Sequence, residues 1–245
     1  MRIPTLVVFT RDLRVRDNPA LSAAGAESSP VVPLFVLDEH LLDSGTFSAN
    51  RTGFLISSLQ DLNNSLDGLG APLVIRRGDW VTEIIRSATE VGANNIHLAD
   101  DTSWYARRRL ERLEAKASTN QLTIHRHPGV SVVPPGVITP AGGGEFKVFT
   151  PYYRRWQNVG WRLPVSPPTS LASAGVQAAG TDLLEDLFIQ RVRGRNSPGV
   201  PPGGETVGRA RFEAWLDHHL IDYTTDRDNL SGDHSSRLSP YLHLG

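Results

Sequence analysis

Three serines and an arginine near the end of the chain form its most chemically distinctive run. Ser235, Ser236 and Ser239 flank Arg237 and Leu238. Serine hydroxyls donate hydrogen bonds to phosphate oxygens, and the planar guanidinium of an arginine can bind two such oxygens at once. The run is therefore suited to hold a pyrophosphate. A polar loop without a ligand is the alternative interpretation of the same composition.

A tyrosine that precedes this run extends the candidate ligand beyond a phosphate. Tyr223 begins a polar stretch that ends at Asp228. An aromatic ring on one side, with hydroxyls and a guanidinium on the other, could hold a dinucleotide cofactor.

Two aspartates that follow predicted strands form a second candidate site. Asp38 follows the strand that contains Phe35 and Leu37, and Asp101 follows another strand. The carboxyl ends of parallel strands meet at one edge of a sheet, where ligands bind. We therefore expect a small pocket with an apolar floor and a polar rim, which suits a planar heterocycle. As the alternative, Asp101 belongs to the cap of the following helix.

Several kinds of site are excluded by what the sequence lacks. The loop of residues 11–19 contains no G-x-G-x-x-G turn, which argues against dinucleotide binding at the first strand. Without cysteine, the chain forms no disulfide and carries no thiolate nucleophile. His218 and His219 are adjacent and cannot share one helix face as metal ligands, so we expect no metal.

The overall composition is that of an ordinary globular protein. With 25 Lys and Arg against 26 Asp and Glu, the net charge is −1, so any contact with nucleic acid must come from a local patch. No segment approaches the ~18 apolar residues of a membrane span. We expect a cytoplasmic monomer without membrane contacts.

Short β-branched runs alternate with amphipathic helical patterns and must position these side chains. Strands are expected at 5–9, 31–37, 73–76, 95–99 and 122–126. Helices are expected at 19–24 with Asn18 as the cap, and at 54–69, 80–91, 104–116 and 205–220, with another beginning at Pro151. In the 104–116 helix, Leu110 and Leu113 mark the inner side, and we interpret Arg107, Arg108 and Arg109 as a solvated face. The alternation of expected strands and helices along the chain predicts an α/β fold with a doubly wound, mostly parallel, five-stranded Rossmann-like sheet.

The composition changes after the fifth predicted strand and indicates three regions. Residues 1–130 form the α/β domain, and residues 131–203 form a long Pro/Gly-rich connector with short helices. Residues 204–245 are expected to be the incomplete start of an all-helical domain. Leu242 and Leu244 have no evident apolar partner, so we expect the segment from Gly204 onward to be loose.

Together these features resemble the photolyase/cryptochrome family over the whole chain. Six motifs occur in order: RDLR with DNP (Arg11–Pro19), LFVLD (Leu34–Asp38), KVFTPY (Lys147–Tyr152), GET (Gly204–Thr206), YTTDR (Tyr223–Arg227) and SSRLSP (Ser235–Pro240). The order and the spacing make the set specific.

The resemblance implies roles for individual residues. It implies that Tyr223, Ser235, Ser236, Arg237, Leu238 and Ser239 bind FAD and that Arg227 lies near the DNA backbone. Phe35, Leu37, Asp38, Arg51 and Asp101 would surround an antenna pigment. Members that bind methenyltetrahydrofolate carry an Asn-Glu pair where this chain has Ala106 and Arg107. The pattern from Asp101 to Tyr105, Ala106 and Arg107 is more similar to members that bind 8-hydroxy-5-deazaflavin.

The implied activity is the light-dependent repair of cyclobutane pyrimidine dimers by electron transfer from reduced FAD. This corresponds to a deoxyribodipyrimidine photo-lyase whose catalytic domain is largely missing, with no catalytic residue in this chain. We therefore expect the 245-residue chain alone to bind FAD weakly and to repair nothing. The alternatives are a cryptochrome-like blue-light photoreceptor and a stand-alone α/β domain that binds the antenna pigment.

Overall fold

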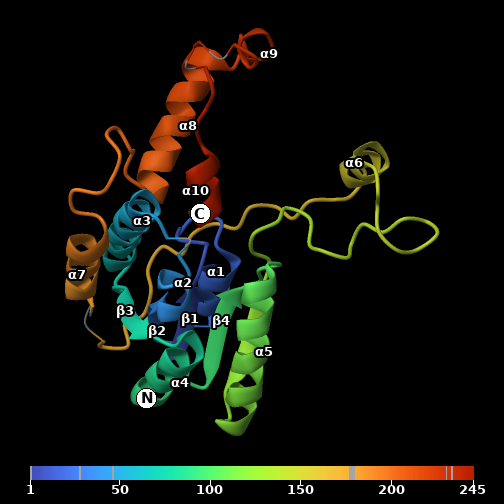
Figure 1. The fold of residues 1–245 in the computed structure, drawn as a ribbon. Helices are drawn as coiled ribbons and strands as arrows, with labels where there is room; N and C mark the ends of the chain where they lie inside the picture. The colour runs from blue at the N-terminus through green and yellow to red at the C-terminus, as the bar shows by residue number, and fades with distance from the viewer. Residues whose placement is uncertain (1, 28, 46, 177–179, 230, 233) are drawn as a thin grey trace.

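The computed structural model describes residues 2–245, except 28, 46, 177–179, 230 and 233. Its centre is a parallel sheet with the strand order β3-β2-β1-β4-β5 (Figure 1). The strands are β1 (Thr5–Phe9), β2 (Val31–Asp38), β3 (Val74–Gly78), β4 (Asn95–Ala99) and β5 (Thr123–His127). The predicted doubly wound α/β sheet is confirmed, and every strand pair is parallel.

The helices alternate with the strands and then continue beyond the sheet. Those of the α/β layers are α1 (Pro19–Ala26), α2 (Glu39–Leu42), α3 (Ala49–Gly68), α4 (Trp80–Val91) and α5 (Trp104–Thr119). The later helices are α6 (Phe149–Gln157), α7 (Thr181–Arg191), α8 (Glu205–His219), α9 (Tyr223–Asp226) and α10 (Ser239–Leu244).

Local capping sets the starts of the long helices. The Asn18 side chain accepts a hydrogen bond from the Leu21 amide, and Pro19 occupies the first position of α1, where its missing N–H is harmless. Ser103 caps α5 in the same way through the Ala106 amide. Helix α4 ends at Gly92, whose φ of +68° suits glycine.

Two apolar clusters cover the two faces of the sheet. Helices α1, α3 and α7 pack on one face, around Phe9, Leu59 and Ile75. Helices α4 and α5 pack on the other, around Val8 and Ile84. Both faces of β1 and β2 are therefore buried, which explains why these strands read as continuous apolar runs.

The connector leaves the α/β domain and then returns to it. Helix α6 stands apart from the sheet layers (Figure 1), and Phe149 on it is 70% exposed. Farther along, the Leu171 amide donates to the Leu69 carbonyl at 2.7 Å. Four apolar side chains after this point join the core on the α3 face: Leu171, Leu184, Leu187 and Val192.

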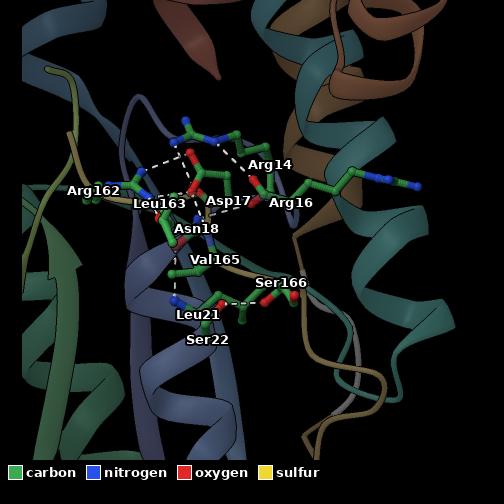
Figure 2. A network of polar contacts seen from close by, with 10 residues as sticks. All are labelled: Arg14, Arg16, Asp17, Asn18, Leu21, Ser22, Arg162, Leu163, Val165 and Ser166. Carbon is green, nitrogen blue, oxygen red and sulfur yellow. Dashed lines mark hydrogen bonds and ion pairs between the residues drawn. The ribbon is translucent and has the colours of Figure 1, made fainter. Parts of the chain in front are cut away.

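An arginine on the returning connector anchors it to the loop between β1 and α1. Arg162 donates to both carboxylate oxygens of Asp17, and the Val165 amide donates to Asp17 Oδ1 at 3.0 Å (Figure 2). Burial alone would raise the pKa of Asp17, but the Arg162 and Val165 hydrogen bonds outweigh it and the pKa is lowered. The Ser22 hydroxyl also donates to the Ser166 carbonyl at 3.0 Å.

Three histidines stack beneath the end of α1. The ring of His97 lies 4.5 Å from that of His125 and 5.1 Å from that of His127, between ring centroids. His97 Nε2 is 3.0 Å from a Glu27 carboxylate oxygen, and the His97 residue is only 2% exposed. Burial lowers the pKa of His97 to about 4, because desolvation of the imidazolium exceeds the attraction of Glu27 and the other histidines oppose a further charge.

We predict that the neutral state of His97 makes the protein less stable in acid. As the pH falls from 6.5 towards 4, the unfolded state takes up a proton that native His97 does not, so the free energy of unfolding decreases. Urea unfolding at a series of pH values measures the free energy of unfolding. Over this pH range it should fall by up to about 2 kcal/mol less in His97→Gln than in the wild type. The exposed His218→Gln serves as the control, and parallel curves for His97→Gln and wild type would contradict the prediction.

Candidate functional site

The candidate antenna site lies at the carboxyl edge of the sheet, where the strand order reverses. The chain proceeds from β1 to β2 and β3 on one side and then crosses to β4 and β5 on the other. Ligands of open α/β sheets bind beyond the strand ends at such a point. A small hollow that opens to solvent lies there, with about 20 Å³ of space for the centre of a water molecule, and it is lined by Thr10, Trp80, Leu98, Ala99, Asp101, Ala106, Arg109 and Leu110.

A buried cluster of opposite charges lies behind one wall of this hollow, which Arg109 and Trp80 line. The Tyr105 hydroxyl donates to Asp38 Oδ2 at 2.7 Å, and Arg109 lies 3.6 Å from the same oxygen. The guanidinium of Arg109 also stacks over the ring of Trp80, 4.3 Å from its centroid. Only 12% of the Arg109 side chain and 3% of the Asp38 side chain are exposed. The cluster thus combines a cation, a carboxylate and an aromatic face at the place where a ring could bind.

The electrostatic environment keeps the cluster in one charge state. Burial raises the pKa of the Tyr105 hydroxyl, and its hydrogen bond to the Asp38 carboxylate raises it further. Burial lowers the pKa of Arg109, while the carboxylate of Asp38 opposes that change. Tyr105 therefore remains a neutral donor, and Asp38 and Arg109 compensate each other's charge in a poorly hydrated place.

Asp101 lies at the same edge but is already engaged by its neighbours. It accepts hydrogen bonds from the Ser103 amide at 2.8 Å and from Arg11 Nη1 at 3.3 Å. Burial would raise its pKa, but these two donors outweigh burial and lower it. Asp101 is thus an ionised carboxylate beside the hollow, and it also supports the start of α5, whose cap is Ser103.

Two expectations about this site are corrected by the structure. Phe35 and Leu37 belong to the apolar cluster on the opposite face of the sheet from Trp80, because side chains of β2 alternate between faces. They do not form the floor of the hollow. Arg109 is not part of a solvated face, although Arg107 and Arg108 are exposed. Arg51, on the first turn of α3, stays a predicted pigment contact: burial, Arg11 and Arg51 lower the pKa of His243 while Asp101 opposes them, so Arg51 and Asp101 act on the same histidine.

The residues expected to bind FAD lie along α8 and the loop that follows it. Trp215 of α8 donates from Nε1 to the His234 carbonyl at 2.9 Å, and the ring of Tyr223 meets Trp215 edge-on at 5.4 Å. Arg211 Nε donates to the Ser236 carbonyl at 2.9 Å. Helix α8 therefore holds the serine–arginine run in place, and Trp215 brings the ring of Tyr223 close to the beginning of that run.

The serine–arginine run presents its polar side chains to solvent. Ser235, Arg237 and Ser239 are exposed, and Leu238 is half-buried. Arg237 has a φ of +51°, in the left-handed region that a non-glycine residue rarely adopts. Such strain is common at ligand-binding loops. The donor set fits a diphosphate.

The two ends of the segment from Gly204 onward are docked on the α/β domain, which corrects the expectation that the whole segment is loose. Tyr241 is 6% exposed, and Leu244 packs against the apolar cluster on the α3 face. The Leu13 amide donates to the Leu244 carbonyl at 2.7 Å. Leu220, Ile221 and Leu242 are 50%, 91% and 79% exposed, so these apolar side chains match the expectation of a face without a partner.

Arg227, the residue expected near DNA, lies at the end of α9. Its side chain is 57% exposed and lies 3.6 Å from the Asp228 carboxylate. In Figure 1, α9 lies at the far end of α8 from the sheet. The structure therefore places Arg227 on the surface, away from the candidate antenna site.

The residues that the structure describes form neither a cluster of metal ligands nor a membrane-spanning helix. Within the described residues, no three or more His, Asp or Glu side chains are grouped closely enough to bind a metal ion. Over the same residues, no helix has both the length and the apolar character required to cross a bilayer.

Comparisons of sequence with known proteins point to the family that the motifs indicated. The family described as DNA photolyase matches residues 5–170. A deoxyribodipyrimidine photo-lyase from Streptomyces griseus is 39% identical over 246 residues, covering 98% of this chain and 52% of the relative. Cryptochrome-2 from Arabidopsis thaliana is 28% identical and is matched over 98% of this chain and 40% of its own length.

Comparison of structures agrees. A bacterial class III photolyase from Agrobacterium tumefaciens superimposes with a TM-score of 0.89 at 25% identity, covering 99% of this chain and 50% of that protein. The chain thus spans about half the length of the relatives it matches.

We predict that Asp38 and Arg109 are strongly coupled. Arg109→Met leaves the Asp38 carboxylate buried without its cation and should lower the free energy of unfolding by about 3 kcal/mol. Asp38→Asn combined with Arg109→Met should recover more than half of this loss, which chemical unfolding of the two single variants and the double variant can measure. Arg108→Met, whose side chain is 65% exposed, is the control. Additive losses in the double variant would show that the two side chains do not interact.

Proposed function

Because this chain belongs to the DNA photolyase family, we propose that its full-length protein repairs cyclobutane pyrimidine dimers in DNA with light. The observation that carries the proposal is the similarity to the deoxyribodipyrimidine photo-lyase of Streptomyces griseus over nearly the whole chain. A flipped-out lesion is the substrate that such a protein would act on, since a damaged base pair costs less to unstack. Arg227 would contribute to the contact with the DNA backbone.

We propose that the run from Ser235 to Ser239 and Tyr223 bind FAD. The exposed hydroxyls and guanidinium of the run supply donors for a diphosphate, and α8 holds the loop through Arg211 and Trp215. Electron donation under light is the chemistry that bound FAD would supply. The chain's own contribution is to orient the nucleotide and to neutralise its diphosphate charge.

We propose that the hollow at the strand edge binds an antenna pigment, 8-hydroxy-5-deazaflavin in preference to methenyltetrahydrofolate. The cluster of Asp38, Tyr105, Arg109 and Trp80 supports this proposal, because Arg109 and Trp80 line the hollow and Asp38, which is hydrogen-bonded to Tyr105, holds the cation of Arg109 there. Asp101 would bind at the rim.

The second candidate is a blue-light photoreceptor of the cryptochrome type, favoured by the similarity to Cryptochrome-2 along the chain. A stand-alone α/β domain that binds the pigment is the third. We propose repair as the function, in the cytoplasm and as a monomer. The absence of cysteine suits that reducing compartment.

The repair proposal predicts a light-dependent activity that requires Arg237. The full-length product of the gene should remove cyclobutane dimers from irradiated DNA under blue light and not in the dark. Arg237→Ala should lower FAD retention at least about tenfold, because a charge-assisted contact with the diphosphate is lost. Arg209→Ala on α8 should retain FAD as the wild type does. A full-length protein that holds FAD and responds to light but leaves dimers intact would favour the photoreceptor.

The antenna proposal predicts a preference between two pigments. The 245-residue chain is mixed with each pigment, passed through gel filtration and read by its absorption spectrum. We expect retention of 8-hydroxy-5-deazaflavin, with Arg109→Met retaining at least about tenfold less. Arg108→Met is the matched control, and retention of folate alone would reject the proposal.

A further inference from the structure

The loop between β1 and α1 contacts the start of α8 through one carboxylate. Glu205 Oε2 accepts a hydrogen bond from the Val15 amide at 2.9 Å, and Oε1 accepts one from the Arg16 amide at 3.3 Å. Two successive backbone amides thus share one side chain that comes from a distant part of the sequence. Glu205 also lies at the first position of α8, where the helix dipole favours a negative charge.

The loop that supplies these amides is itself held firmly. Asp12 is 5% exposed and Asn18 is fully buried. Asp12 Oδ1 accepts from the Thr10 amide at 3.0 Å, and Asn18 Nδ2 donates to Asp12 Oδ2 at 3.2 Å and to the Arg14 carbonyl at 3.0 Å. Figure 2 shows how Asn18 and Arg14 converge around the Asp17 turn. The amides of Val15 and Arg16 therefore form a fixed donor pair.

The beginning of α8 is fixed from a second direction by α3. The Gly203 amide donates to the Ser57 hydroxyl at 2.7 Å, and the Thr206 amide donates to Asp61 Oδ2 at 3.0 Å. Gly204 has a φ of +122°, and a Cβ atom there would lie 2.7 Å from Asp61 Cβ. Only glycine permits this approach, so α8 starts directly against α3.

Helix α10 completes the attachment. The ring of Tyr241 meets Phe54 of α3 edge-on at 5.1 Å, and its hydroxyl donates to the Pro202 carbonyl at 2.9 Å. At the other end of α10, Arg11 Nη2 lies 3.1 Å from His243 Nδ1, while Arg11 Nη1 lies 3.3 Å from Asp101. One arginine therefore contacts both the edge of the candidate antenna site and the end of α10.

We propose that Glu205 is a positioning residue that fixes the helical segment on the α/β domain. By holding Val15 and Arg16, its carboxylate acts together with the α3 and α10 contacts to set the direction of α8, and so the position of Tyr223 and the serine–arginine run relative to the strand edge. The idea deepens the proposed function, since excitation passes between two pigments only at a suitable distance and orientation. It rests on that function for the identity of the ligands and not for the attachment itself.

The test measures the geometry of the 245-residue chain without any cofactor. Because the chain has no cysteine, Ala115→Cys on α5 and Ala214→Cys on α8, both exposed, accept two nitroxide labels at unique positions. Pulsed electron spin resonance should give one narrow distance distribution, and Glu205→Ala should at least double its width. Glu205→Gln keeps one acceptor oxygen and should give an intermediate width.

A second readout reports the two hydrogen bonds directly. In Glu205→Ala, amide hydrogen exchange at Val15 and Arg16 should accelerate at least about tenfold, while the β1 amides keep their rates. The matched control is Glu213→Ala, which removes the same charge from an exposed pair within α8. If Glu205→Ala loses helical circular dichroism, Glu205→Gln carries the test.

The outcomes separate this inference from the repair proposal. Wild-type distance widths and exchange rates in Glu205→Ala, or in Glu205→Gln when that variant carries the test, would overturn the positioning role and leave the repair proposal unaffected. A failed repair assay with broadened distances in Glu205→Ala would leave the positioning role standing.

Discussion

The loop after β1 must turn away from the sheet without leaving a buried polar group unpaired, and both the connector and α8 attach to the conformation that it adopts. Asp12 and Asn18 bind the backbone of the loop from inside, since both side chains are buried and hydrogen-bonded. The outward-facing groups of the same loop are then available to distant segments. Asp17 binds the connector, and the amides of Val15 and Arg16 bind α8.

The charged groups at the strand edge are arranged in pairs of opposite charge. The site is therefore stable as it stands but is destabilised when one member of a pair is removed. Asp38 faces Arg109, and Asp101 faces Arg11. Removing one member of such a pair costs more than the pair itself contributes, because the remaining charge stays poorly hydrated. A ligand at this edge would have to replace the contacts that it displaces. The same charge pairs would therefore also select for rings with matching donors and acceptors.

Much of the fold could be predicted from local sequence, whereas the site needed long-range contacts. The β-branched runs and the caps at Asn18 and Gly92 mark strands and helix ends because those preferences act within a few residues. Three adjacent arginines give no such signal, and only the packing of α5 against Trp80 shows that Arg109 turns inward. The two-residue period of β2 would have separated Asp38 from Leu37. The docking of Tyr241 against Phe54 is a contact between remote segments, which local patterns do not encode.

The core on the α3 face is completed by residues that follow the last strand at a long distance along the chain. Leu171, Leu184, Leu187 and Val192 belong to that core, although β5 ends at His127. Exchange of α/β layers between relatives, whether by recombination or by protein engineering, therefore needs a crossover point beyond Val192. A hybrid joined directly after the sheet would expose an apolar groove along α3 and would be prone to aggregate.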